Sequence, residues 1–415
     1  MNETSDQRKP YSHVRVLDMS RVLAGPWAGQ VMADLGAEVI KVERPIAGDD
    51  TRHWGPPFLK DEAGRTTQEA AYYMCANRGK KSITVDISKP DGQALIRALA
   101  AKCDVLLENY KVGDLPRYGL GYEDLKAVNP DLIYCSVTGF GQTGPSRQLT
   151  GYDFMIQAIG GLMSLTGHGD SEPGGGPMKV GVPVADLVTG LYTAIAIQAA
   201  LARRERTGGG GEWIDMALLD CQVAMLANQG QNYLSGDGRL TPRMGNAHPN
   251  VAPYEVFATQ DGHMVLAVGT DSQFRKFCAA VDRPELSTDP RFLTNSDRVT
   301  NRRDLSPLMA AIIASKQTAQ WLEVFGNVGV ACGPINTLRE VYRHPQVVDR
   351  GLVFEMQHPI GGKVPLTANP IRFVEHPIHY EVPPPLLGQH TRNVLGGLLG
   401  LDSAEIDRLE GNGIV

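Results

Sequence analysis

The residue of this 415-residue chain best suited to chemistry is an aspartate that follows a glycine-rich segment. Residues 174–185 begin with three glycines and a proline and end in a short apolar run, after which Asp186 is the one acid before a long apolar pattern. Apolar side chains then recur three or four residues apart, which predicts a helix over 187–205. A basic turn and the glycines from Gly208 end it. Asp186 is therefore expected at or just before the start of a buried helix.

Two roles suit Asp186 at this position. As an N-cap, its carboxylate would accept hydrogen bonds from the free backbone N–H groups of the first turn. As a nucleophile, it would attack a carbonyl carbon, and the positive end of the helix would keep it ionised in an apolar pocket. The glycines before it would let a ligand approach the backbone. The segment alone does not decide between the two roles.

The composition indicates a globular protein and excludes several classes. Acidic residues outnumber basic ones by 46 to 40, so no strongly basic face is expected to bind nucleic acid. The six cysteines are scattered without a CxxC pair or a Cys/His cluster, which disfavours a disulfide scaffold and a zinc site. The first residues resemble neither a signal nor a transit peptide. The longest apolar stretch, 191–202, is shorter than a membrane span. We therefore expect a cytoplasmic protein.

The elements that must position Asp186 have an α/β pattern. Residues 14–44 alternate strand, helix and strand, and such a unit implies a parallel sheet. Further apolar strands are predicted at 82–87, 104–109 and 132–137, as in a sheet covered on both faces. The composition shifts near 206–212, and a second α/β unit is expected over 212–340.

The second half of the chain predicts a hairpin and several helices. Asp261-Gly262 is a typical hairpin turn within 255–270. Helical patterns follow at 272–282, 301–315 and 318–328, and strand patterns at 332–337 and 351–357. The segment 383–391 is predicted to be a linker that precedes a last helix.

A dinucleotide site is the first alternative to consider. Residues 139–144 match G-x-G-x-x-G after a strand, but Pro145 follows at once and no apolar helix begins there. Glu43 ends the second strand, where an NAD enzyme places its ribose-binding acid. An NAD-dependent oxidoreductase therefore stays open as an alternative.

The order of the motifs resembles that of the family III CoA-transferases, also called the formyl-CoA transferase/carnitine CoA-transferase family. The matching segments, besides the Asp186 helix, include VRVLDMSRVLAGP, LGAEVIKVERPIAGDDTR, NRGKKSITVDI, LIYCSVTGFGQTGP, GNAHPNVAPY and PPPLLGQHT. Within the family, RVLAGPWAG, ERPIAGDDTRHWGPPF, GFGQTGP and VADLVTGLY are most similar to the succinyl-CoA:glutarate (hydroxymethylglutarate) branch.

The resemblance implies an architecture. A Rossmann-like large domain would be built from both termini, residues 1–211 and 341–415, and joined to the smaller α/β domain over 212–340. Two subunits would interlock as a homodimer. Coenzyme A and acyl-CoA enter as substrates, and neither a metal nor a permanently bound cofactor is implied.

The resemblance also implies a mechanism centred on Asp186. The family's aspartate attacks the thioester of a donor acyl-CoA to give an aspartyl anhydride, and CoA then returns to form an aspartyl-CoA thioester. The branch implies succinyl-CoA as donor and a dicarboxylate such as glutarate as acceptor. The loop with Gly245 and Asn246 would supply oxyanion donors and shield the anhydride from water.

Contacts with CoA carry over from the family pattern at ten positions: Val22, Leu23, Arg44, Ala71, Met74, Asn109, Tyr110, Arg117, Thr138 and Phe140. Arg44 and Arg117 suit phosphate, because guanidinium binds its oxygens in pairs, although surface salt bridges are the ordinary role of such residues. Leu23 and Thr138 replace a glutamine and a lysine of formyl-CoA transferase, so oxalate and formate are not expected as acids. Arg52, Arg78 and His248 are the candidate cations for a distal carboxylate.

An isomerase of the α-methylacyl-CoA racemase branch is the main alternative. That chemistry needs two acid/base groups around the α-carbon, and the racemases supply one from a G-H-D sequence. The corresponding residues here are Gly151-Tyr152-Asp153. A tyrosine, with a pKa of about 10, is a poor base at neutral pH.

Overall fold

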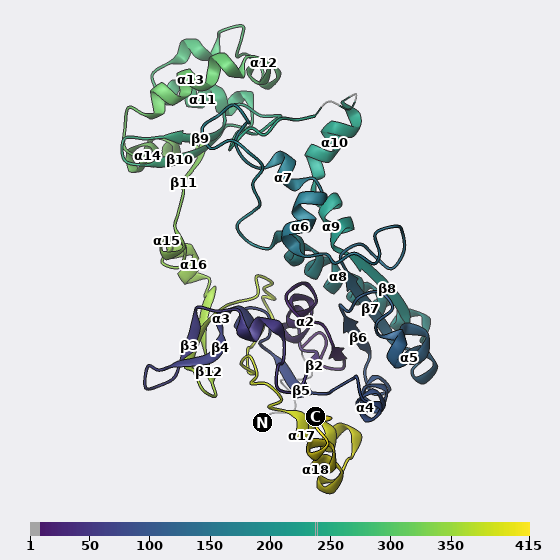
Figure 1. The fold of residues 1–415 in the computed structure, drawn as a ribbon. Helices are drawn as coiled ribbons and strands as arrows, with labels where there is room; N and C mark the ends of the chain where they lie inside the picture. Colours follow the sequence, from purple (N-terminus) through teal and green to yellow (C-terminus); the bar gives the residue numbers. More distant parts are fainter. Residues whose placement is uncertain (1–8, 237, 239) are drawn as a thin grey trace. The chain divides into compact units, whose positions relative to one another are not determined.

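The computed structural model describes residues 9–236, 238 and 240–415. They form two compact units (Figure 1). The first comprises the residues up to Gly160, Gly181–Met225 and Pro345–Val415, and the second comprises Gly161–Val180 and Leu226–His344.

A six-stranded parallel sheet forms the centre of the first unit, with the strand order β5-β2-β1-β6-β7-β8. Its strands are β1 Arg15–Asp18, β2 Glu38–Glu43, β5 Lys80–Thr84, β6 Val105–Glu108, β7 Ile133–Thr138 and β8 Glu212–Ala217. Successive side chains of a strand point to opposite faces, so Val16 and Leu17 belong to two different hydrophobic cores. The predicted α/β fold with a sheet buried on both faces is confirmed.

Helices cover both faces of this sheet. They are α2 Ala24–Asp34, α4 Pro90–Ala100, α5 Tyr122–Val128, α6 Asp153–Ile159, α8 Val184–Thr207, α9 Leu218–Met225, α17 Thr391–Leu399 and α18 Ser403–Gly411. The core on one face holds residues of α2 and α8, and the core on the other holds residues of α4, α17 and α18. The C-terminal segment joins this unit through β5, where the Ser82 carbonyl accepts from the His390 N–H at 2.9 Å.

Helix α8 is longer than the sequence pattern predicted. It begins at Val184, directly after Pro183, and runs for 24 residues. Within the described part of the chain it is the one helix long and apolar enough to cross a membrane, with a mean hydropathy of 1.5 over a window that is 44% buried. The expectation that no stretch reaches that length is thus corrected. Gly190 lets α8 pack closely on α2, because a Cβ there would lie 2.7 Å from the Ala24 carbonyl oxygen.

Two antiparallel hairpins complete the first unit. One pairs β3 Phe58–Lys60 with β4 Thr66–Ala70 and leads into the short helix α3 Ala71–Met74. The other pairs β12 Val353–His358 with β13 Gly362–Thr367 after helix α16 Pro345–Asp349. Side chains of α3 and of the second hairpin share a small hydrophobic core. The sequence pattern predicted the first strand of that hairpin and missed its partner, β13.

The second unit is built on a three-stranded antiparallel sheet of β9 Tyr254–Ala258, β10 His263–Ala267 and β11 Ala331–Pro334. Its helices include α7 Leu162–Leu165, α10 Ala227–Ser235, α11 Asp271–Ala280, α12 Asn295–Thr300, α13 Arg302–Ile313, α14 Thr318–Val328 and α15 Leu338–Val341. Phe277, Trp321 and Phe325 stack in its core. The hairpin turn at Asp261-Gly262 is confirmed.

The boundary between the units differs from the predicted one. The composition shift at 206–212 suggested that the smaller domain begins at residue 212 and runs to residue 340. Instead β8 extends the large sheet beside β7, because the glycines before it turn the chain back onto the sheet. Gly211 lies so close that a Cβ would be 2.2 Å from the Leu132 carbonyl oxygen. The second unit takes its first residues from 161–180, its main part from Leu226 on, and ends at His344.

Candidate active site

Asp186 lies in the first turn of α8, and the cap of that helix is another residue. Pro183 occupies the N-cap position, and the acceptor at the helix start is Asp153. The Asp153 Oδ1 accepts from the Ala185 N–H at 2.8 Å and from the Asp186 N–H at 3.5 Å. No hydrogen bond reaches the Asp186 carboxylate from any described residue. The N-cap interpretation of Asp186 is therefore wrong, and its side chain is left without a structural partner.

The surroundings of Asp186 raise its pKa. The side chain is buried, with 9% of the residue's surface exposed. Burial raises the pKa of its carboxyl, and the nearby charge of Asp153 raises it further, to about 7. The expectation that the helix start would keep the acid ionised is thus corrected, because the N–H groups of that turn donate to Asp153 instead. Near neutral pH, Asp186 is a carboxylate of unusually high basicity.

A cavity of about 170 Å³ opens on Asp186 at the carboxyl ends of the parallel strands. Open α/β sheets bind their ligands at this edge. The walls come from the turn after β1, the turn after β6, the turn after β7 and the loop that follows it: Arg21 to Ala24, Asn109 to Val112, Val137 to Gly139 and Arg147 to Tyr152.

The loop after β7 closes on itself at its base. Gly139 and Gly151 touch, since a Cβ added to Gly139 would lie 2.5 Å from the Gly151 Cα. Only glycine permits this approach. The intervening loop lines the cavity with Arg147, and two residues after its end Asp153 caps α8.

A second cavity of about 290 Å³ adjoins the first, because Arg21 and Tyr110 line both. Arg44 lines the second cavity, and its guanidinium shares the Asp50 carboxylate with that of Arg21 at 3.0 and 3.1 Å. Two guanidinium groups side by side suit a phosphate-bearing ligand. Together the cavities form a site with a basic carboxylate at one end and paired arginines toward the other.

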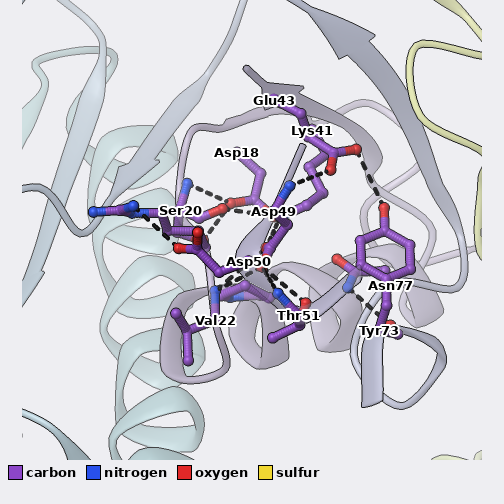
Figure 2. A network of polar contacts seen from close by, with 12 residues as sticks. Asp18, Ser20, Val22, Lys41, Glu43, Asp49, Asp50, Thr51, Tyr73 and Asn77 are labelled. Atoms are coloured by element: carbon purple, nitrogen blue, oxygen red, sulfur yellow. Dashed lines mark hydrogen bonds and ion pairs between the residues drawn. The ribbon is translucent and has the colours of Figure 1, made fainter. Parts of the chain in front are cut away.

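A buried polar network lies beneath the turn after β1 (Figure 2). Asp49 accepts from Lys41 Nζ at 2.9 Å and from the Val22 N–H, and Lys41 also donates to the Ser20 carbonyl. Asn109 holds the same turn from the other side: its Oδ1 accepts from the Arg21 N–H at 3.0 Å and its Nδ2 donates to the Arg21 carbonyl at 2.7 Å. The turn that lines both cavities is thus fixed through its backbone.

Comparison with known proteins identifies the family of this chain. The model of CoA-transferase family III matches residues 11–391. The chain belongs to that family. It is 47% identical to a succinate–glutarate CoA-transferase of Agrobacterium fabrum, over 96% of this chain and 98% of the relative. It is 45% identical to the human succinyl-CoA:glutarate CoA-transferase, over 98% of this chain and 90% of the relative.

A solved structure supports the same assignment. A CAIB/BAIF family protein from Brucella suis is 47% identical, with a TM-score of 0.81 over 94% of this chain and 99% of that one. The protein is therefore a family III CoA-transferase with the mixed α/β fold of that family, and the resemblance found in its motifs is confirmed.

Six of the ten predicted CoA contacts line the two cavities of this CoA-transferase. Val22, Leu23, Asn109, Tyr110 and Thr138 line the first cavity together with Asp186, and Arg44 lines the second. The side chain of Asn109 bonds to the Arg21 backbone, so this residue shapes the site as well as lining it.

The other predicted CoA contacts lie outside the cavity walls. Arg117 is exposed and pairs with Asp114, which itself lines the second cavity. Met74 is buried, Ala71 begins α3, and Phe140 packs against the core around α2 and α8. For these four residues the CoA contact stays a prediction.

The two arginines predicted to bind a distal carboxylate are engaged elsewhere. Arg52 is buried, pairs with Glu43 at 2.8 Å and Glu69 at 3.3 Å, and stacks its guanidinium on Tyr73 at 3.7 Å. Arg78 is also buried and forms a two-bond pair with Asp34 at 2.6 and 2.8 Å. Neither lines the cavities, and their charges are already neutralised, so the structure favours a structural role for both.

The remaining predicted residues belong to the second unit. The Gly245 N–H donates to the Gly167 carbonyl at 3.0 Å, which ties its loop to the glycine-rich segment of that unit. His248 packs against Tyr254 with ring centroids 5.2 Å apart, and Asn246 is exposed. Their roles toward substrate stay predictions.

The residues that correspond to the racemase G-H-D sequence do not form a second acid/base group here. Tyr152 is 62% exposed, and the Asp153 carboxylate is occupied by backbone N–H groups of α8 and by the Gln157 amide at 2.8 Å. Both observations favour transfer over isomerisation.

Sequence reasoning missed several residues that build the site. Asp153 caps a helix more than thirty residues further along the chain, which no local pattern reveals. Arg21 and Arg147 line the cavity from turns in which charged residues are ordinarily solvated. Lys41 and Asp49 lie in a segment quoted for the family resemblance, and the available signal was Lys41 between Ile40 and Val42 in an apolar strand.

Proposed function

We propose that this CoA-transferase moves CoA from succinyl-CoA to a dicarboxylate such as glutarate through covalent intermediates on Asp186. The observation that carries the proposal is the buried, unpartnered carboxylate of Asp186 at one end of two adjoining cavities that also hold Arg21 and Arg44. The names of the relatives from Agrobacterium fabrum and human supply the acid pair.

The reaction proceeds in four exchanges. An Asp186 carboxylate oxygen attacks the thioester carbonyl carbon, the C–S bond breaks, and CoA leaves as a thiolate from a mixed anhydride. The thiolate then attacks the Asp186 carbonyl, which releases succinate and leaves an aspartyl-CoA thioester. The acceptor carboxylate displaces CoA from that thioester to form a second anhydride. The thiolate finally attacks the acceptor's carbonyl, which yields the new acyl-CoA and restores Asp186. Covalent catalysis thus divides one difficult exchange into easier steps.

The cavity walls indicate how CoA would bind. We place the thioester end near Asp186, among Val22, Leu23, Asn109, Tyr110 and Thr138, and the phosphates toward Arg44 and Arg117. Ala71, Met74 and Phe140 carry over from the family pattern, as do Gly245 and Asn246 as oxyanion donors and shield.

A dicarboxylate needs a cation beside the nucleophile, and Arg147 is the best placed. The basic residues lining the cavity of Asp186 are Arg21, Lys111 and Arg147. Arg21 is already paired with Asp50, whereas no ion pair is formed by Lys111 or Arg147 among the described residues. Arg147 lies on the loop that ends next to the α8 cap. We therefore assign it the distal carboxylate, a role for which His248 was also predicted.

This assignment predicts a selective defect. Arg147→Gln should raise the KM for glutarate about tenfold at saturating succinyl-CoA, since one charge-assisted contact of roughly 1.4 kcal/mol is lost. Pentanoate, which has a methyl group in place of the distal carboxylate, should react equally well with both enzymes. Arg147→Lys should retain part of the preference. An equal loss with both acids would place Arg147 on CoA instead.

Trapping tests the mechanism directly. Incubation with succinyl-CoA, quenching and peptide mass analysis should reveal an acyl or CoA adduct on the peptide that contains Asp186, and Asp186→Asn should show none. A panel of acids assayed against succinyl-CoA should give dicarboxylates as the preferred acceptors. Full exchange activity in Asp186→Asn would refute the mechanism, whereas deuterium wash-in at an α-carbon without acyl exchange would indicate an isomerase.

We further propose that the enzyme is a cytoplasmic homodimer. Apolar side chains are exposed along α6 and α8, among them Phe154, Ile159, Leu191 and Ile195. Patches of this kind are typical of protein interfaces. Sedimentation at micromolar concentration should give twice the mass of the chain, and a monomer would contradict the proposal.

A further inference from the structure

Val22 adopts a backbone conformation that its side chain disfavours. Its φ of 71° lies in the left-handed region, where a β-branched residue is a rare outlier. Such a conformation persists only where the surrounding structure imposes it. Because Val22 lines the cavity of Asp186, whatever imposes this conformation also shapes the site.

The groups that impose it are a buried ion pair. Asp49 and Lys41 are 2% and 0% exposed, and their charged atoms lie 2.9 Å apart. The Asp49 carboxylate accepts from the Val22 N–H at 3.2 and 3.3 Å, and Lys41 Nζ donates to the Ser20 carbonyl at 2.9 Å. The pair therefore holds the turn at Ser20 and at Val22, both labelled in Figure 2.

The carboxylate of this ion pair is also held by Thr51. Thr51 donates to Asp49 through its N–H at 3.0 Å and its hydroxyl at 2.8 Å, so the carboxylate is fixed in place. Burial alone would raise the pKa of Asp49, but the charge of Lys41 and the Thr51 donors outweigh it and lower that pKa. The group stays ionised and acts as a rigid acceptor.

The next residue extends the arrangement outward. Asp50 pairs with Arg21 and Arg44, while Asp49 holds the backbone from which the Arg21 side chain projects. Asp49 thus fixes the backbone of the Ser20–Val22 turn, and Asp50 fixes the Arg21 side chain. This turn lines both cavities.

We propose that Lys41 and Asp49 are positioning residues of the transferase, which hold the Ser20–Val22 turn in the conformation that receives acyl-CoA. They touch neither the thioester nor Asp186, and act through Val22 and Arg21. The inference rests on the proposed contact between this turn and CoA.

Asp49→Asn provides the test, because it keeps the size and one acceptor oxygen of the side chain while removing its charge. The KM for succinyl-CoA should rise at least tenfold, and the KM for glutarate should change less than threefold. Hydrogen exchange of the backbone amides at 20–24 should become faster. Asp34→Asn is the matched control: it breaks a buried pair with Arg78 in the same unit, away from both cavities, and should alter neither the succinyl-CoA KM nor that exchange.

A second substitution separates positioning from general loss of stability. Glycine adopts positive φ without strain. Adding Val22→Gly to Asp49→Asn should therefore lower the KM for succinyl-CoA at least threefold from its value in Asp49→Asn. If Asp49→Asn does not fold, Lys41→Arg, whose larger head cannot bridge Ser20 and Asp49 in the same geometry, is measured in the same way.

The outcomes are distinct. An unchanged succinyl-CoA KM in a folded variant, an equal rise in the control, or no recovery with glycine would overturn the inference. Protection of the 20–24 amides by CoA in the unaltered enzyme tests the proposed CoA contact separately. If exchange is faster in Asp49→Asn but CoA does not protect these amides, the ion pair holds the turn and the turn does not contact CoA. That result would refute the role of Lys41 and Asp49 in transfer.

Discussion

Two buried aspartates at the same edge of one sheet have opposite surroundings. Asp49 accepts hydrogen bonds from Lys41, Thr51 and Val22, and these donors keep its pKa low despite its burial. Asp186 is nearly as buried, but no described residue donates to it, and its pKa rises to about 7. Burial is common to both, so the partners decide which carboxylate is structural and which is available for reaction.

The largest effect on stability should come from the partnered acid. Asp49→Ala removes the carboxylate bonded to the buried Lys41 ammonium and leaves it only the charges of Asp18 and Glu43, so we expect a loss of about 3–5 kcal/mol in the free energy of unfolding at pH 7. Denaturant titration with circular dichroism measures it. Asp186→Ala should lose far less, and equal losses would mean that the two acids are not distinct.

Substitution of Asp186, the proposed nucleophile, should change the free energy of unfolding in the opposite direction. The pKa of Asp186 is about 7 in the fold against an ordinary value of 3.8, so its favourable contribution is fully present below pH ~4 and is lost as pH rises through 7. Asp186→Asn removes that penalty and should stabilise the protein by roughly 2–4 kcal/mol at pH 8. At pH 4 the gain should nearly vanish. A lower melting temperature than the parent enzyme at pH 8 would contradict this assignment.

The smallest effect concerns the pH dependence of the reaction. In the proposed mechanism only ionised Asp186 attacks the thioester, so kcat/KM for succinyl-CoA should rise with pH up to about 7 and then level off. Asp153→Asn keeps an oxygen to cap α8 but removes a nearby negative charge. The pH–rate profile of this variant should therefore move to lower pH, by about one unit or less. A profile that moves upward would show that the charge of Asp153 does not act on Asp186.

The features that could be predicted from the sequence depend on local pattern. The β1-α2-β2 unit, the apolar strands and the helix that follows Asp186 all appear as periodic residues, and the motif order identified the family. The cap of α8 could not be predicted, because Asp153 reaches it from a distant segment. The charges of Arg52 and Arg78 are neutralised by acids on other elements, Glu43 and Asp34, so a count of basic residues overstated their availability.

Backbone conformation was the other feature that the sequence concealed. Glycine or asparagine signals a left-handed residue, whereas Val22 gives no such signal and is held there by tertiary contacts. The boundary at 212 failed for a similar reason, because the return of β8 to the sheet depends on close packing of Gly211. The candidate reactive residue could be predicted from its residue type. The tertiary contacts that position or neutralise other residues could not.

The contact between Gly139 and Gly151 has an evolutionary consequence. It brings the two ends of the loop 140–150 together, so the sequence of the middle of this loop can change without moving β7 or the cap of α8. With Asp186 as the proposed attacking group and Arg147 as the proposed partner of the acid, these two properties can be inherited separately, the first in the helix and the second in the loop. Transplanting this loop between relatives should carry the preferred acid with it and leave the turnover chemistry intact.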